Sequence, residues 1–229
     1  MSKQLHSAMV AILEMPYFKN ETAKSGGATY GHEAAVSERI KAAGFTEICK
    51  STYPGLKKGL LKKWAETGND TDLKIVTQGM PAGSYILQPA GSQGFPDVLV
   101  KDFGAQDRFI AIECKSGKSG LTPMWNDNLP KPNTIYVLSS GKLDQTTVFL
   151  GKDVISEEEY KTQISFWKEQ KELEAKYRAV MKKLDVFSRG WDIKGRPQNF
   201  QGGGGKKTNY FTHVDRKNCE TNVLNFANQ

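Results

Sequence analysis

The chain has 229 residues, of which 25% are charged and 38% are hydrophobic, and this length is enough to bury one substantial core. Its 32 lysines and arginines exceed its 25 acidic residues, which gives a net charge of +7 and a pI near 9.2 and favours a polyanionic partner. No apolar run approaches the roughly 20 residues that span a bilayer, so the sequence excludes a transmembrane protein.

The cysteines indicate a reducing compartment. Cys49, Cys114 and Cys219 are odd in number and widely spaced, and no CxxC or Cys/His cluster suggests a zinc site. The N-terminus has no charged segment ahead of a long apolar one, which is the pattern of a secretion signal. We therefore expect a soluble, intracellular, cytoplasmic protein.

The first predicted elements are two helices joined by a linker. Apolar residues recur at helical spacing over residues 5–15, and residues 20–28 form a polar, glycine-containing linker. Residues 30–45 have the pattern of an amphipathic helix that Gly44 closes. The first turn of this helix carries Glu33, where a carboxylate interacts favourably with the helix dipole.

Residues 46–90 have a mixed pattern. We predict a helix over residues 55–66, a strand over residues 72–78 and another strand over residues 84–88. Positive charge is concentrated at the start and middle of the predicted helix, at Lys57, Lys58, Lys62 and Lys63.

The next predicted element is a β-hairpin. Residues 98–101 are apolar, a short glycine-containing break follows, and residues 108–115 are again typical of a strand. Side chains alternate between the two faces of a strand, so Glu113 and Lys115 share one face. Asp97 lies where the first strand of the hairpin begins.

Two more strands follow a loop. Residues 116–131 are rich in glycine, proline and asparagine and are predicted to form the loop. Residues 133–140 have the pattern of a buried strand, and residues 146–150 that of a shorter strand paired with it.

The longest predicted element is a charged helix over residues 156–185. Ser156 and Glu159 form a capping box at its start, and its apolar residues follow helical spacing. About thirty residues at a rise of 1.5 Å give a helix of roughly 45 Å. Two interpretations stay open: the helix packs across the back of the sheet, or it projects towards a partner.

Asp97, Glu113 and Lys115 bring two carboxylates and an amine to one end of the predicted hairpin. Burying unpaired charges costs several kcal/mol, and a metal ion with a phosphate ligand would relieve that cost. Two carboxylates can bind Mg²⁺ while water and phosphate oxygens fill its other positions, and the ion lowers the pKa of a bound water. The alternative is structural: Glu113 and Lys115 form a salt bridge on a half-exposed strand, and Asp97 is a turn acid.

The PD at residues 96–97 and the ECK at residues 113–115 resemble the active site of the PD-(D/E)xK nuclease superfamily, which includes most type II restriction endonucleases. The helix over residues 30–45 is similar to the first core helix of that superfamily, and the resemblance covers about residues 30–150. It implies an α/β protein with a restriction-endonuclease-like core, in which helices flank a central mixed β-sheet.

The resemblance also implies an activity, the hydrolysis of double-stranded DNA at a specific sequence with Mg²⁺, or Mn²⁺ in its place, and no organic cofactor. Asp97 and Glu113 would ligate the metal, Lys115 would position and activate the attacking water, and the products would carry 5′-phosphate and 3′-hydroxyl ends. Glu33 would reach the metal directly or through water, unless it is only a favourable first-turn acid. Because one site cuts one strand, a symmetric target implies a homodimer. Such a protein is of prokaryotic or phage type and needs no membrane.

Basic and amide side chains beyond the hairpin are the predicted DNA contacts, because amides can read adenine and basic groups can read guanine. Ten basic residues stand against three acidic ones between residues 178 and 217, so we expect a basic, DNA-contacting elaboration over about residues 156–229. An ordinary solvated surface is the alternative. The predicted contacts are Lys118, Asn126, Asn128, Arg189, Arg196, Gln198, Asn199, Gln201, Lys206, Lys207 and Asn209.

Two other functions stay open. A repair, recombination or phage nuclease of the same superfamily would use the same chemistry but select DNA by its structure. A non-catalytic DNA-binding protein would keep Glu113 and Lys115 as a structural pair. In all three cases we predict a single domain over residues 1–229.

Overall fold

The structure is a computed structural model, and the chain divides into two compact units that are described separately. The first unit comprises Met1–Met124, Lys131–Val154 and Gln201–Gln229, and the second comprises Trp125–Pro130 and Ile155–Phe200. The described residues are 3–19, 21–22, 28–29, 31–92, 94–104, 107–117, 121–123, 125, 129–184, 192–193, 195 and 209–229.

A six-stranded open sheet forms the centre of the first unit, with the strand order β3-β4-β5-β6-β7-β8. It is mixed: β3 and β4 are parallel, as are β6 and β7, and the other neighbours are antiparallel. The strands are β3 (Thr46–Glu47), β4 (Ser84–Leu87), β5 (Val98–Lys101), β6 (Phe109–Gly117), β7 (Thr134–Ser140) and β8 (Gln145–Leu150).

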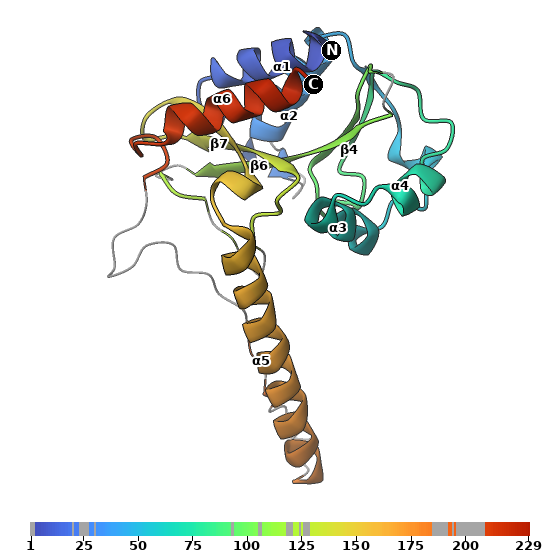
Figure 1. Cartoon of the computed structure of the whole chain (residues 1–229), viewed down its shortest axis with the longest axis vertical. Helices are drawn as coiled ribbons and strands as arrows, with labels where there is room; N and C mark the ends of the chain where they lie inside the picture. Colours follow the sequence, from blue (N-terminus) through green and yellow to red (C-terminus); the bar gives the residue numbers. More distant parts are fainter. Residues whose placement is uncertain are drawn as a thin grey trace. The chain divides into compact units, whose positions relative to one another are not determined.

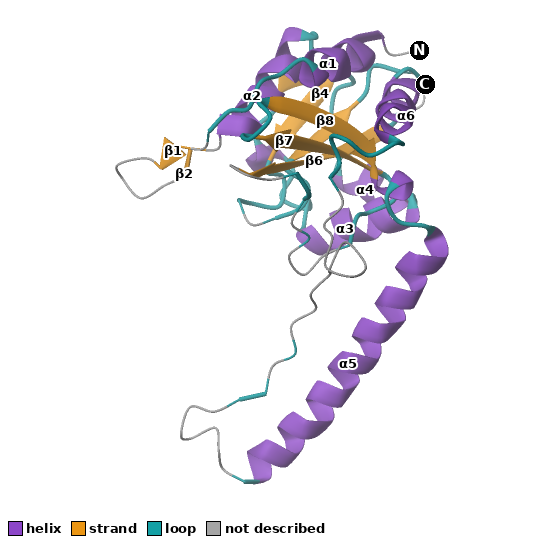
Figure 2. Cartoon of the chain, turned by 90° about the vertical axis from the view of Figure 1, so that its left-hand side faces the viewer, coloured by secondary structure: helices purple, strands orange, loops and turns teal. Residues whose placement is uncertain are grey.

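Helices cover both faces of this sheet, as Figures 1 and 2 show. One face carries α1 (Lys3–Leu13), α2 (Gly31–Ala42) and α6 (Arg216–Ala227), and the opposite face carries α3 (Lys58–Thr67) and α4 (Thr71–Val76). The predicted class, an α/β protein with a mixed sheet flanked by helices, is confirmed. No helix in the described part of the chain is long and apolar enough to cross a membrane.

The alternation of side chains along the strands divides the core into two layers. Val98 and Ile112 pack in the layer that includes α1, α2 and α6, whereas Leu99, Ala111 and Ile86 pack in the layer that includes α3 and α4. Helices from both ends of the chain therefore complete the core, which extends beyond residues 30–150.

Most of the predicted elements of this unit are confirmed. The hairpin forms as β5 and β6, with Val98 opposite Ile112, and β6 runs two residues further than predicted, to Gly117. The predicted linker contains two short antiparallel strands, β1 (Glu21–Thr22) and β2 (Ala28–Thr29). The other confirmed elements are α1, α2, α3, β4, β7 and β8, and short 3-10 helices occur at Lys50–Thr52 and Gly151–Asp153.

The predicted strand over residues 72–78 is wrong, because Thr71–Val76 form helix α4. Lys74 pairs with Asp70 one turn earlier at 3.0 Å, and Leu73 is the residue that this turn buries. Ile75 is 67% exposed. A six-residue helix is too short to display helical periodicity in the sequence.

The long helix α5 (Glu157–Lys183) belongs to the second unit. Ser156 Oγ accepts a hydrogen bond from the Glu159 amide at 3.2 Å, and the Glu159 carboxylate accepts one from the Ser156 amide at 2.8 Å, so the capping box is confirmed. The structure describes all 27 residues of α5, and none of them is buried. Both interpretations of where this helix lies stay predictions.

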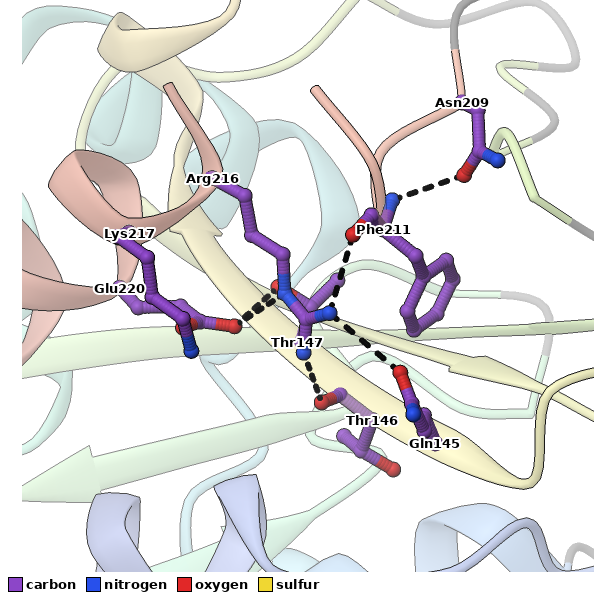
Figure 3. Close-up of polar contacts among 8 residues, drawn as sticks. All are labelled: Gln145, Thr146, Thr147, Asn209, Phe211, Arg216, Lys217 and Glu220. Carbon is purple, nitrogen blue, oxygen red and sulfur yellow. Dashed lines mark hydrogen bonds and ion pairs between the residues drawn. The ribbon is translucent and has the colours of Figure 1, made fainter. Parts of the chain in front are cut away.

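The C-terminal residues were predicted to be part of a basic arm, but they form the core helix α6. Val223 and Ala227 are fully buried, and a polar cluster attaches the start of the helix to β8 (Figure 3). Glu220 accepts hydrogen bonds from Thr147 at 2.8 Å and from Arg216 at 2.7 Å, and Lys217 lies 2.9 Å from its second oxygen. Arg216 and Lys217 thus serve to fix α6 in place.

Replacing Glu220 with glutamine is expected to lower the free energy of unfolding by about 2 kcal/mol at neutral pH, because a charged acceptor of three bonds is lost. Burial raises the pKa of Glu220, but the bonds from Lys217, Arg216 and Thr147 outweigh it and lower that pKa. The stabilisation is therefore present above the ordinary carboxyl pKa and lost as the pH falls through the folded-state value.

Urea unfolding of wild type and Glu220→Gln at neutral and acidic pH tests this expectation. Glu38→Gln, which removes an exposed carboxylate on α2, is the matched control and is expected to change little. A constant difference between wild type and Glu220→Gln at every pH would contradict an electrostatic role for Glu220.

Candidate active site

The predicted site residue Asp97 lies at the junction of three strands. Its carbonyl accepts a hydrogen bond from the Gln88 amide at 2.7 Å, at the end of β4, and its Oδ2 accepts one from the Cys114 amide of β6 at 2.7 Å. The register that pairs Val98 with Ile112 brings Asp97, one residue earlier, level with Glu113. The hairpin therefore holds the two predicted metal ligands next to each other.

Glu113 and Lys115 lie on the same face of β6, as predicted. The Lys115 ammonium donates to Glu113 Oε1 at 2.7 Å, and only 14% of the Glu113 side chain and 25% of the Lys115 side chain are exposed. Glu113 Oε2 is buried and has no hydrogen-bond partner in the described part of the structure. One oxygen of this carboxylate thus remains available for a cation.

Glu33, in the first turn of α2, joins this group of acids. Its Oε2 accepts a hydrogen bond from Gln88 Nε2 at 3.0 Å. Burial raises the pKa of Glu33, and repulsion from Glu113 raises it further, against the opposing effects of Gln88 and Lys115. The structure therefore brings Glu33 within electrostatic reach of the predicted site.

Gln88 was not predicted as a site residue. It adopts a left-handed conformation with φ of 45°, which is uncommon for a residue other than glycine, asparagine or aspartate. This conformation accompanies its two bonds, one to the Asp97 carbonyl and one to the Glu33 carboxylate. A single glutamine at the end of a strand gives no sequence signal for such a role.

The acidic group is electrostatically strained. Burial, together with repulsion from Glu113 and Glu33, raises the pKa of Asp97 from 3.8 to about 8. Burial also opposes the charged form of Lys115, but the charges of Glu113 and Asp97 outweigh it and raise the pKa of this ammonium. Ionising Asp97 beside Glu113 and Glu33 is therefore unfavourable unless an additional cation offsets the negative charge.

The residues present fit a divalent metal ion. Asp97 and Glu113 supply carboxylate oxygens, which are the donors that Mg²⁺ prefers, and one Glu113 oxygen is buried without a partner among the described residues. Within the same part of the chain, no three acidic, histidine or cysteine side chains already form a group that could hold a metal. A cation would therefore draw the carboxylates together and relieve the repulsion that raises the Asp97 pKa.

Two lysines flank the acidic group on the α3 side of the sheet. The Lys131 side chain is only 4% exposed, and its ammonium lies 3.4 Å from Glu66 Oε1 and 5.1 Å from the centre of the Phe95 ring. Lys62 lies one turn before Glu66 on α3. The Asn133 amide and side chain both donate to the Ala65 carbonyl, at 3.1 and 3.2 Å, and so attach the Lys131 segment to α3.

Both ammonium groups are held at an electrostatic cost. Burial lowers the pKa of Lys131 and of Lys62, and the charge of Lys131 lowers the Lys62 pKa further. The charge of Glu113 raises both pKa values, so the two lysines are within electrostatic reach of the candidate metal ligand. The basic cluster predicted on this helix included Lys62, whereas a lysine between two prolines gave no signal for Lys131.

Two other neighbours of the site have structural roles. His32 is buried, its Nε2 lies 3.3 Å from the Val137 carbonyl, and burial lowers its pKa. Burial and the charge of Asp97 raise the pKa of the Cys114 thiol well above its usual value. Cys114 therefore stays protonated and is not a nucleophile.

The structure describes one of the eleven predicted DNA contacts. Asn209 Oδ1 accepts a hydrogen bond from the Phe211 amide at 2.9 Å, which stabilises the turn before α6 (Figure 3). The residues outside the described part of the chain are Lys118, Asn126, Asn128, Arg189, Arg196, Gln198, Asn199, Gln201, Lys206 and Lys207.

Comparisons of the chain with models of known protein families, with curated proteins and with solved structures found no match.

Proposed function

We propose that the chain is a Mg²⁺-dependent endonuclease of the PD-(D/E)xK type that cuts double-stranded DNA at a specific sequence, as a type II restriction enzyme does. The observation that carries this proposal is the meeting of Asp97, Glu113, Lys115 and Glu33 where β5 begins. An unpaired buried Glu113 oxygen and a raised Asp97 pKa are properties of a site adapted to a cation.

Each side chain has a role in this proposal. Asp97 and Glu113 would hold Mg²⁺, which supplies charge neutralisation at a phosphate and lowers the pKa of a bound water. Lys115, whose pKa is raised by Glu113, acts as an ammonium donor that orients the attacking water and offsets charge on the phosphate. Glu33, positioned by Gln88, takes part through a water molecule. Mn²⁺ is expected to substitute for Mg²⁺.

The arrangement of elements supports a restriction-endonuclease-like core. An antiparallel hairpin carries the acids and the lysine, and α2 brings its first-turn carboxylate to the same end of the sheet. One such site cuts one strand, so cleavage of both strands of a symmetric target calls for a homodimer.

Lys131 and Lys62 are the proposed contacts to the DNA backbone beside the cut. Their ammonium groups and Glu113 interact electrostatically, and a phosphate would balance the positive charge that burial disfavours in both. Phosphate contacts set the position of the duplex without reading its sequence. These lysines would therefore hold the strand over the metal site.

Lys131→Gln is expected to weaken DNA binding by about tenfold and to lower the slope of log K against log salt by about 1. Because Lys131 is buried, Lys62→Gln on the half-exposed face of α3 provides a second variant with the same expectation. Fluorescence anisotropy in EDTA, over a series of salt concentrations, measures binding without cleavage. Lys41→Gln at the exposed end of α2 is the control, and an equal loss in that variant would contradict a local phosphate contact.

The test of the function is incubation of the purified chain with unmethylated phage DNA, in Mg²⁺ and in EDTA. Discrete Mg²⁺-dependent fragments are expected. A Mg²⁺-dependent smear would favour the repair, recombination or phage nuclease, which selects DNA by its structure.

A non-catalytic DNA-binding protein is the second candidate, and the 2.7 Å ion pair between Lys115 and Glu113 favours it. In that case the pair serves only to stabilise β6. DNA binding without divalent ions, together with intact DNA under every divalent ion tested, is the result that this candidate predicts.

A further inference from the structure

Gln88 directly follows β4, and its side chain does not continue the alternation of that strand. Tyr85 and Leu87 pack in the layer of α1, α2 and α6, whereas Ile86 packs in the layer of α3 and α4. In an extended conformation the side chain of residue 88 would therefore point to the α3 side of the sheet. It is instead bonded to Glu33, which belongs to α2 on the opposite face.

The left-handed conformation of Gln88 accounts for this change of face. With φ at 45°, the main chain leaves the extended path of β4. The Gln88 amide still donates to the Asp97 carbonyl at 2.7 Å, which extends the pairing of β4 with β5, and the Gln88 carbonyl accepts a hydrogen bond from the Gly91 amide at 2.8 Å, which closes a turn. The main chain of Gln88 thus supports Asp97, while its side chain supports Glu33.

Glutamine is not the residue that such a turn requires. A left-handed backbone is easiest for glycine, and asparagine and aspartate tolerate it best among the other residues. Residues held in a disfavoured conformation occur mainly at functional sites. The constraint on Gln88 is the length of its side chain, because its amide reaches Glu33 Oε2 at 3.0 Å and an asparagine amide would be one methylene group short.

The Gln88 amide restricts a carboxylate that is only half-buried in the first turn of α2. The bond engages Oε2 of Glu33, so Oε1 of the same group stays outside it and can hold a water molecule at the proposed metal ion. Groups that form hydrogen bonds with a carboxylate at a metal site orient that carboxylate, and their loss weakens metal binding or activity by roughly 10–100-fold.

We infer that Gln88 is a positioning residue of the proposed metal site, where it holds the Glu33 carboxylate towards the ion and thereby raises the affinity of the site for Mg²⁺. This role rests on the proposed function and adds to it a residue that touches neither the metal ion nor the DNA. It also explains why a long amide side chain occupies a left-handed position at the end of β4.

Gln88→Asn separates the side chain from the turn, because asparagine suits the left-handed backbone but does not reach Glu33. The variant is expected to be at least as stable as wild type to urea in EDTA. It is expected to bind Mg²⁺ about tenfold more weakly, by calorimetry without DNA, and to cleave saturating DNA roughly 10–100-fold more slowly. Gln78→Asn, the same change at an exposed glutamine after α4, is the control and is expected to behave as wild type.

A double variant identifies Glu33 as the residue through which Gln88 acts. Glu33→Gln is expected to weaken Mg²⁺ binding by itself, and adding Gln88→Asn is expected to change the dissociation constant by less than about twofold more. Additive losses, or a Gln88→Asn variant that is less stable than wild type and binds Mg²⁺ equally well, would overturn the inference and leave Gln88 a structural role.

The same measurements distinguish this inference from the proposed function. If wild type cleaves DNA in Mg²⁺ and Gln88→Asn keeps the wild-type Mg²⁺ affinity and rate, the positioning role is wrong and the nuclease assignment stands. A wild type that neither binds Mg²⁺ nor cleaves DNA would overturn both.

Discussion

Lys115→Ala is expected to lower the rate of Mg²⁺-dependent DNA cleavage by about 10³-fold, with little change in DNA affinity. Its ammonium is largely buried and lies 2.7 Å from the proposed metal ligand Glu113, where it would orient the attacking water. This interaction stabilises the transition state more than it stabilises the bound DNA, because the phosphate gains charge only as the reaction proceeds. A loss in rate without a loss in affinity follows.

Single-turnover cleavage and anisotropy binding on the same DNA measure the two quantities separately. Lys152→Ala, which removes an exposed lysine after β8, is the matched control and is expected to retain wild-type rates. Full activity of Lys115→Ala would remove Lys115 from the proposed mechanism. An equal loss of rate and affinity would assign it to DNA binding.

Asp97→Asn is expected to abolish cleavage and yet to stabilise the metal-free protein by about 3 kcal/mol at pH near 8. Burial and the repulsion from Glu113 raise the pKa of Asp97 from 3.8 to about 8, and one pKa unit corresponds to about 1.4 kcal/mol. The partial exposure of Asp97 moderates the total, because solvent screens its charge. Asparagine keeps an oxygen for the Cys114 amide but carries no charge.

The sign of this effect depends on pH. A carboxyl whose pKa is raised on folding binds more protons in the folded state, so it lowers stability as the pH rises from about 4 towards 8. The variant lacks this titration, and its advantage over wild type is expected to be small near pH 4 and to grow above it. Urea unfolding in EDTA across this range measures the difference. Asp72→Asn on α4, which removes an exposed carboxylate, is the control.

Mg²⁺ is expected to reverse the order of stability. A thousandfold excess over its dissociation constant stabilises a folded protein by about 4.1 kcal/mol, which exceeds the advantage of the variant, and only the wild type retains the proposed ligand Asp97. A wild type that is more stable than Asp97→Asn in EDTA near pH 8 would contradict the view of Asp97 as a strained metal ligand. It would instead indicate an ionised acid that stabilises the turn before β5.

The sequence predicted the part of the site that depends on local pattern. Side chains alternate between the two faces of a strand, and this alternation was enough to place Glu113 and Lys115 on one face. The pairing of Val98 with Ile112 then brings Asp97 level with Glu113. Gln88 and Lys131 could not be predicted, because their roles depend on contacts with residues distant in the sequence, Glu33 and Glu66.

The same distinction applies to the fold. Strands bounded by glycine and proline were predicted, whereas the short helix α4 and the core helix α6 were not. In α6 the buried residues Glu220, Val223 and Ala227 include a charged one, and its burial is possible only because Thr147 and Arg216 satisfy it. Polar contacts of this kind depend on the tertiary structure. They produce no regular spacing of apolar residues in the sequence from which the helix could be predicted.

The most direct test of the metal site is a time course of DNA cleavage by wild type and by Asp97→Asn, each in Mg²⁺ and in EDTA. Because the variant is expected to be at least as stable as wild type without metal, a loss of activity cannot be attributed to unfolding. Cleavage by wild type in Mg²⁺ alone, with none in the other three reactions, is the predicted result. Cleavage by Asp97→Asn at the wild-type rate, or no cleavage by wild type, would contradict a nuclease centre built on Asp97, Glu113 and Lys115.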